Sequence, residues 1–143
     1  MQKRNSDKLQ YAIQSLENAI KYSRSGEFQV VGIEFKSVLI STVAQNFHLT
    51  FAVCCQMISW QLTDRLGAEK VENMSKEELL QMAAKEGMIT SLSRWLEYLD
   101  CDSAPSNNGA FRAFEKAPAF LEDAGELLHT CSVRSQNERR RAA

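Results

Sequence analysis

The longest apolar stretch of the chain runs from Glu34 to Leu66 and contains neither glycine nor proline. Its middle, from Phe47 to Trp60, is apolar on nearly every side of a helix, which is typical of a helix that its neighbours enclose. At about 1.5 Å per residue such a helix extends roughly 50 Å, so we expect a bend or a contact with a partner along it. We therefore predict one long central helix around which the other elements pack. The residues expected to share one core are Phe47, Phe51, Met57 and Trp95.

A shorter apolar stripe precedes this stretch. Between Leu9 and Ile20 apolar residues recur at intervals of four, three and four, the spacing of one helix face. Ser6 or Asp7 is a suitable N-cap, and Gly26 follows a basic last turn. The pattern predicts a first helix that begins near Ser6 and ends by Gly26.

Two short helices are predicted after the central one. Ser75 and Glu78 have the spacing of a capping box, in which each residue satisfies a backbone amide of the other. The helix that they open should end at Gly87, and Thr90 or Ser91 should cap the next one. One face of that second helix carries Leu92, Trp95, Leu96 and Leu99. We expect these two helices to form a hairpin.

A last apolar stripe runs from Phe111 to Leu128, with Pro118 inside it. Because proline lacks the amide hydrogen that a helix needs, we expect Pro118 to kink or restart the helix. Residues 132–143 are polar and rich in arginine, with too little apolar surface to fold. The sequence thus predicts a single helical-bundle domain at 1–131 and a disordered tail at 132–143.

Composition supports this architecture. Two prolines and six glycines in 143 residues leave few turns for a sheet protein, so we predict an all-α fold: an antiparallel bundle of about five helices around the long one. The net charge of −1 gives no overall field that attracts nucleic acid or an anionic membrane. The N-terminus has no apolar leader, and the apolar centre from Leu49 to Trp60 is too short to span a bilayer. We expect a cytoplasmic protein that does not enter the membrane.

Candidate chemistry is sparse. The four cysteines form no C-x-x-C motif and are interpreted as buried thiols, so no metal and no cofactor is predicted. Of the two histidines, we interpret His48 as a partly buried, hydrogen-bonded residue rather than a base, and His129 lies in no motif. Glu122 and Asp123 are placed on the solvent side of the last helix. No residue is predicted to be catalytic, and contact of the C-terminal arginines with nucleic acid or a nucleotide stays open.

The stretch from Cys101 to Gly109 consists of turn-forming residues and is predicted to be the one long loop of the domain. Since recognition often resides in loops on a rigid scaffold, it is the expected place of binding. The candidate substrate-binding or partner-binding residues are Tyr98, Asp100, Asn107 and Asn108. The alternative is that these residues only form the turn.

Several segments together resemble a known family. They are Phe47-x-x-Thr50-Phe51, the stretch from Ser75 to Ile89, the tryptophan helix from Trp95 to Leu99, and the stretch from Phe114 to Leu121. This combination resembles the nucleotidyltransferase substrate-binding protein family, small HEPN-like helical bundles that pair with a minimal nucleotidyltransferase encoded beside them. His48 and Ala52 stand where that family usually has glutamates. The resemblance implies a homodimer that serves as the non-catalytic substrate-binding or regulatory partner of such a transferase.

The stretch from Cys101 to Gly109 departs from the family, which has an Arg-Asn pair and a His-x-Tyr there. The Arg-x(4-6)-His motif of HEPN ribonucleases is absent from the whole chain, so the resemblance implies an accessory subunit and not an enzyme. Two alternatives remain. One is a HEPN-type ribonuclease or toxin whose active residues have moved to His129 and the C-terminal arginines, and the other is a free-standing helical interaction module.

Overall fold

In the computed structural model the backbone is described for residues 2–24, 33–103 and 106–142, and the side chains for residues 6–24, 36–103 and 109–134. Over these residues the chain forms six helices and no strand, which confirms the predicted all-α bundle. The helices are α1 (Gln2–Arg24), α2 (Ile33–Leu66), α3 (Ala68–Glu72), α4 (Lys76–Lys85), α5 (Leu92–Ser103) and α6 (Ser106–Ala142). The short α3 lies in what the sequence predicts to be an irregular connection, and α1 begins before the predicted N-cap.

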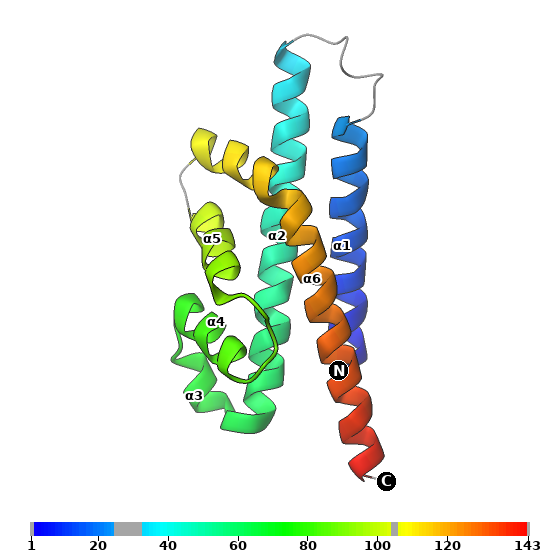
Figure 1. Cartoon of the computed structure of the whole chain (residues 1–143), viewed down its shortest axis with the longest axis vertical. Coiled ribbons are helices and arrows are strands. Elements are labelled where there is room, and N and C mark those ends of the chain that lie inside the picture. The colour runs from blue at the N-terminus through cyan, green and yellow to red at the C-terminus, as the bar shows by residue number, and fades with distance from the viewer. Residues whose placement is uncertain (1, 25–32, 104–105, 143) are drawn as a thin grey trace.

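Helix α2 is the central element, with bounds within one residue of the predicted ones. Figure 1 shows α1 beside it, α6 crossing both, and α4 and α5 on its other flank. Successive helices α1 and α2 run antiparallel in this view. Each of these neighbouring helices contributes buried apolar side chains to the core around α2.

The core is built around aromatic rings from three helices. The ring centroids of Phe47 and Phe120 are 4.6 Å apart, those of Phe51 and Trp95 6.4 Å, and those of Tyr98 and Phe120 5.0 Å. These are distances at which aromatic pairs add to the free energy gained by burial. Phe47, Phe51, Met57 and Trp95 all belong to this one core, as predicted.

The expectation that α2 is enclosed on nearly every side is only partly correct. Leu49 is 65% exposed, and Val38 and Trp60 are also exposed, so one face of the helix is open to solvent over part of its length. No Asp, Glu, Lys or Arg occurs between Lys36 and Asp64, so this face also lacks charge. Periodicity failed to show the open face because its side chains are apolar or uncharged, like those of the buried faces.

By length and composition alone, one helix among the described residues, Lys36–Leu66, could cross a membrane. In the structure 44% of its most apolar window is buried inside the bundle. The core helix of a soluble protein meets the same criterion, so a single such helix is weak evidence for a membrane span.

Local signals place α4 and α5 correctly. The Ser75 hydroxyl accepts a hydrogen bond from the Glu78 amide at 3.1 Å, and the Ser75 amide donates to the Glu78 carboxylate at 3.4 Å, so the capping box is present. The Ser91 hydroxyl accepts from the Arg94 amide at 3.3 Å at the start of α5. Gly87 has a positive φ of 75°, a conformation that other residues rarely adopt, and it ends the α4 segment as predicted.

Helix α6 differs most from expectation. It continues through Pro118, and Figure 1 shows it changing direction where yellow gives way to orange, the region of that proline. It also continues to Ala142, so the predicted disordered tail at 132–143 is helical as far as the backbone is described. Arginine, glutamate, glutamine and alanine favour helix, and the buried Cys131 anchors the preceding turn in the core. The division of the chain into a domain at 1–131 and a tail remains a prediction.

Candidate functional site

The predicted loop from Cys101 to Gly109 is not a loop over most of its length. Helix α5 extends to Ser103 and α6 begins at Ser106, which leaves only residues 104 and 105 outside the described backbone. Serine and asparagine are favoured at the start of a helix as well as in turns, which is why the composition was misleading. Asn107 and Asn108 lie on the first turn of α6, and their side chains are outside the described residues.

Tyr98 points into the protein. Its side chain is buried, and its hydroxyl donates a hydrogen bond of 2.5 Å to Oδ2 of Asp123. Burial, followed by the bond to Asp123, raises the pKa of Tyr98 well above its ordinary value. This geometry favours a structural role for Tyr98, and its role in binding remains a prediction.

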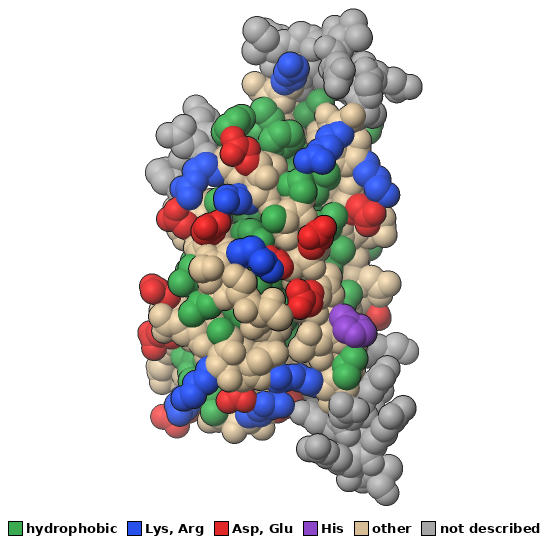
Figure 2. Space-filling view, viewed as in Figure 1, with side chains coloured by type: hydrophobic (Ala, Val, Ile, Leu, Met, Phe, Trp, Pro, Cys, Tyr) green, Lys and Arg blue, Asp and Glu red, His purple; other side chains and the backbone are tan. Residues whose placement is uncertain are grey.

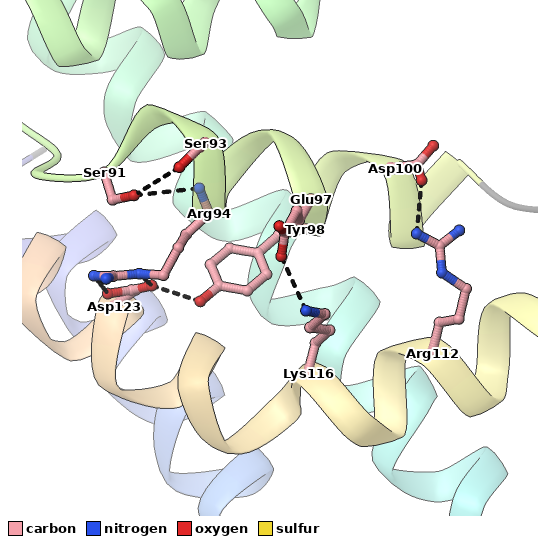
Figure 3. Close-up of polar contacts among 9 residues, drawn as sticks. All are labelled: Ser91, Ser93, Arg94, Glu97, Tyr98, Asp100, Arg112, Lys116 and Asp123. Atoms are coloured by element: carbon pink, nitrogen blue, oxygen red, sulfur yellow. Dashed lines mark hydrogen bonds and ion pairs between the residues drawn. The ribbon is translucent and has the colours of Figure 1, made fainter.

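Asp123 is the centre of this cluster, contrary to the prediction that it faces solvent. Its side chain is 6% exposed and accepts two hydrogen bonds from Arg94, Nε at 3.0 Å and Nη2 at 2.8 Å, besides the one from Tyr98. The bidentate contact is the strongest arrangement between a guanidinium and a carboxylate. Figure 3 shows Arg94 and Tyr98 reaching the same carboxylate from α5.

Two further ion pairs join α5 to α6 in Figure 3. Lys116 Nζ lies 2.9 Å from Glu97, and Arg112 Nη2 lies 2.7 Å from the predicted site residue Asp100. With Arg94–Asp123 they form three successive bridges between the two helices, which we call the α5–α6 ladder. Figure 2, in the same orientation as Figure 1, shows basic and acidic side chains interspersed on this face of the molecule. Because each charge in the ladder has a partner, this face carries no strong local field.

A second polar cluster joins three elements at the side of α2. The Asp102 carboxylate, at the end of α5, lies 2.8 Å from Nδ1 of His48 through Oδ1 and 3.6 Å from Nζ of Lys76 through Oδ2. The predicted interpretation of His48 as a partly buried, hydrogen-bonded residue is confirmed. Because the Asp102 carboxylate accepts a hydrogen bond from Nδ1 of His48, it favours the tautomer of His48 that carries its hydrogen on Nδ1 and leaves Nε2 as an acceptor. The sequence pattern does not indicate this cluster, because its members are distant in the chain.

A groove opens beside this cluster along α2. It has a volume of about 450 Å³ and is lined by Ala52, Cys55, Gln56, Ser59, Trp60, Lys76 and Leu79. A smaller hollow of about 240 Å³ continues past it towards α3 and shares Ser59 and Trp60 as lining residues. Trp60, 38% exposed, is thus the boundary between the two. We call the larger hollow the α2–α4 groove.

The thiols offer no reactive centre. All four cysteines are free and buried, and burial raises the pKa of Cys55 and of Cys131 to about 11. A thiol that stays protonated at neutral pH is a poor nucleophile and a poor metal ligand. Within the described residues no group of three or more histidine, cysteine, aspartate or glutamate side chains lies close enough to hold a metal ion.

Comparison with known proteins identifies one similar structure. The chain superposes with a TM-score of 0.78 and 21% sequence identity on HI0074 from Haemophilus influenzae, over 89% of this chain and 98% of that one. That structure is described as revealing the fold of a substrate-binding domain of a nucleotidyltransferase. No protein-family model matches the sequence, and no curated protein does. The likeness establishes a shared fold.

Proposed function

We propose that this chain is the non-catalytic substrate-binding or regulatory partner of a minimal nucleotidyltransferase encoded near it. The observation that carries the proposal is the fold shared with HI0074 over nearly the whole of both chains, since that fold is described for a substrate-binding domain of a nucleotidyltransferase. The sequence segments that resemble the substrate-binding family lie on α2, α4, α5 and α6, which form most of the bundle. A cytoplasmic location belongs to the same proposal.

The arrangement of polar groups supports an accessory role. The α5–α6 ladder consists of charges paired with one another, which stabilise helix packing and offer no free nucleophile or base. The ribonuclease alternative places activity at His129 and the C-terminal arginines. His129 is exposed on α6, but the guanidinium of Arg134 donates to the backbone carbonyl of Glu86. Incubating the pure protein with labelled RNA tests that alternative, and cleavage that disappears in His129→Ala would establish it.

The open face of α2 supports the homodimer that belongs to this proposal. Interface cores are depleted of charged side chains, and this face exposes Val38 and Leu49 within a stretch that contains none. A two-fold dimer pairs the same patch of both subunits, so an uncharged helix face can meet a copy of itself without charge repulsion. We place the contact on the half of α2 from Val38 to Leu49.

Sedimentation tests the dimer. The unmodified chain should sediment at about twice its mass of 16.2 kDa at micromolar concentration, and Leu49→Glu should convert it to the monomer. Tyr11→Glu is the matched control, because Tyr11 is exposed on a different helix, α1. A monomeric unmodified chain would remove the dimer from the proposal.

A pull-down with the neighbouring transferase tests the proposed function itself. The tagged chain should retain the transferase through several washes at moderate salt. Replacing Asn107 and Asn108 with alanine should weaken retention if the first turn of α6 contacts the partner, whereas Asn18→Ala on α1 should not. Retention equal to that of an unrelated helical bundle would refute the proposal.

A further inference from the structure

Trp60 lies in an unusual position for so large an apolar side chain. Its indole separates the α2–α4 groove from the hollow beside α3 and remains more than a third exposed. Gln56 and Ser59 line the groove next to it, and no charged residue of α2 lies between Lys36 and Asp64. The groove is thus lined by a partly exposed indole with an amide and a hydroxyl beside it, groups that can hold a heteroaromatic ring.

The opposite wall of the groove carries a positive charge. Lys76, at the start of α4, lines the groove, and its side chain is 58% exposed. Its contact with Asp102 is long, at 3.6 Å, while the same carboxylate lies only 2.8 Å from His48. Because Asp102 is shared and its shorter contact is with His48, the Lys76 ammonium keeps donors for an anion in the groove.

The smaller hollow has the opposite character. Besides Ser59 and Trp60 it is lined by Glu72, whose carboxylate repels an anion. The charged groups that line the two hollows therefore differ, with Lys76 on one side of Trp60 and Glu72 on the other. An anionic ligand that stacks on Trp60 is favoured with its charged end towards Lys76.

We infer that the α2–α4 groove binds a nucleotide, whose base stacks on Trp60 beside the amide of Gln56 and whose phosphate meets Lys76. From Ala52 to Trp60 the groove follows α2 for about 12 Å, at 1.5 Å per residue, which suits a mononucleotide. Its volume of about 450 Å³ lies within the range of small-molecule sites, roughly 300 to 1,000 Å³. The inference rests on the proposed function in choosing a nucleotide among ring-bearing anions, because a transferase partner handles nucleotides.

Calorimetric titration of the full chain with adenosine 5′-monophosphate, adenosine and inorganic phosphate tests the inference. The monophosphate should bind more tightly than either fragment, since only it engages both walls. Lys76→Met should weaken monophosphate binding about tenfold and leave adenosine binding unchanged. Lys70→Met, which removes an exposed lysine from α3, is the matched control and should change neither.

Variants at Trp60 test the stacking. Trp60→Ala should weaken both the monophosphate and adenosine at least tenfold, since loss of the ring removes the contact that both share. Trp60→Phe keeps a smaller ring and should give an intermediate affinity, and it replaces the alanine variant should that one fail to fold. Quenching of tryptophan fluorescence by the monophosphate should disappear in Trp60→Phe, because the remaining Trp95 is buried.

The same variants separate this inference from the proposed function. If the unmodified chain binds the monophosphate but retains no transferase, the groove stands as a nucleotide site and the proposed function fails. If the unmodified chain binds no monophosphate at millimolar concentration, or if Lys76→Met and Lys70→Met bind it equally, the inference is wrong. Loss of transferase retention in Trp60→Ala, without monophosphate binding by the unmodified chain, would make the groove a docking surface for the transferase and overturn the inference.

Discussion

Replacing Asp123 with alanine is the sharpest test of how α5 is fixed to α6. The change removes the acceptor of three hydrogen bonds, two from Arg94 and one from Tyr98. The two donors differ in what they lose. Arg94 is half exposed and can turn to water, whereas the buried Tyr98 hydroxyl donates to Asp123 and would be left beside Arg94, which can only donate and cannot accept its hydrogen.

The expected loss follows from this difference. A buried hydroxyl without a partner costs about 1 to 3 kcal/mol, and a pair with a half-exposed guanidinium contributes roughly 1 kcal/mol. Asp123→Ala should therefore lower the free energy of unfolding by about 2 to 4 kcal/mol. Urea titration followed by circular dichroism measures it, with the slope of the titration as a check that the folded state is intact. Glu122→Ala, at the exposed neighbouring position, is the matched control and should change the stability by less than about 0.5 kcal/mol.

A double-mutant cycle with Tyr98→Phe tests whether the Tyr98 hydroxyl depends on the carboxylate of Asp123. In the Tyr98→Phe background no hydroxyl is stranded, so Asp123→Ala should cost about 1 to 2 kcal/mol less than in the unmodified chain. If Asp123→Ala costs the same in both backgrounds, Tyr98 does not depend on that carboxylate. If it costs less than about 0.5 kcal/mol in the unmodified chain, the buried cluster contributes nothing measurable to stability.

Three further predictions concern the core, the thiols and the capping box. Phe51→Ala should lower the free energy of unfolding by about 3 to 5 kcal/mol in a urea titration, because Phe51 is fully buried among aromatic rings, and a loss below about 1 kcal/mol would contradict its place in the core. Burial raises the pKa of Cys55 and of Cys131 in the folded chain from 9.0 to about 11. Between these pH values the unfolded chain loses the two thiol protons and the folded chain keeps them, so the free energy of unfolding should fall as the pH rises from about 9 to 11. Titrations at pH 8 and 10.5 measure this fall, which Cys131→Ala should reduce; equal stability at both values would contradict it. Ser75→Ala should cost about 1 kcal/mol in the same assay, and an unchanged stability would contradict the role of the capping box.

Sequence alone predicts the parts of this fold that depend on neighbouring residues. The bounds of α2 follow from an uninterrupted run, and the start of α4 follows from a capping box whose two members are three residues apart. Both signals are local and keep their meaning in any helical fold. The resemblance of several segments to one family adds the bundle architecture that the shared fold bears out.

The polar clusters were missed for the opposite reason. Tyr98 and Asp123 are 25 positions apart, and His48 and Asp102 are 54 apart, so only the packing of the helices brings them together. Asp123 was misplaced because it stands next to Glu122, and an acidic pair on a helix ordinarily faces solvent. The predicted loop failed because asparagine and serine open helices as readily as they form turns.

The bend of α6 at Pro118 gives the helix two arms that respond differently to ionic strength. The arm before the proline is joined to α5 by the exposed bridges of Arg112 and Lys116, which salt screens, and Pro118 itself offers no amide hydrogen to the turn before it. The arm after the proline is joined through the buried carboxylate of Asp123, which salt reaches far less. Raising the ionic strength therefore weakens the exposed bridges of the first arm, which the buried Ala113 and Ala117 still hold in the core, and changes the contact of the second arm far less.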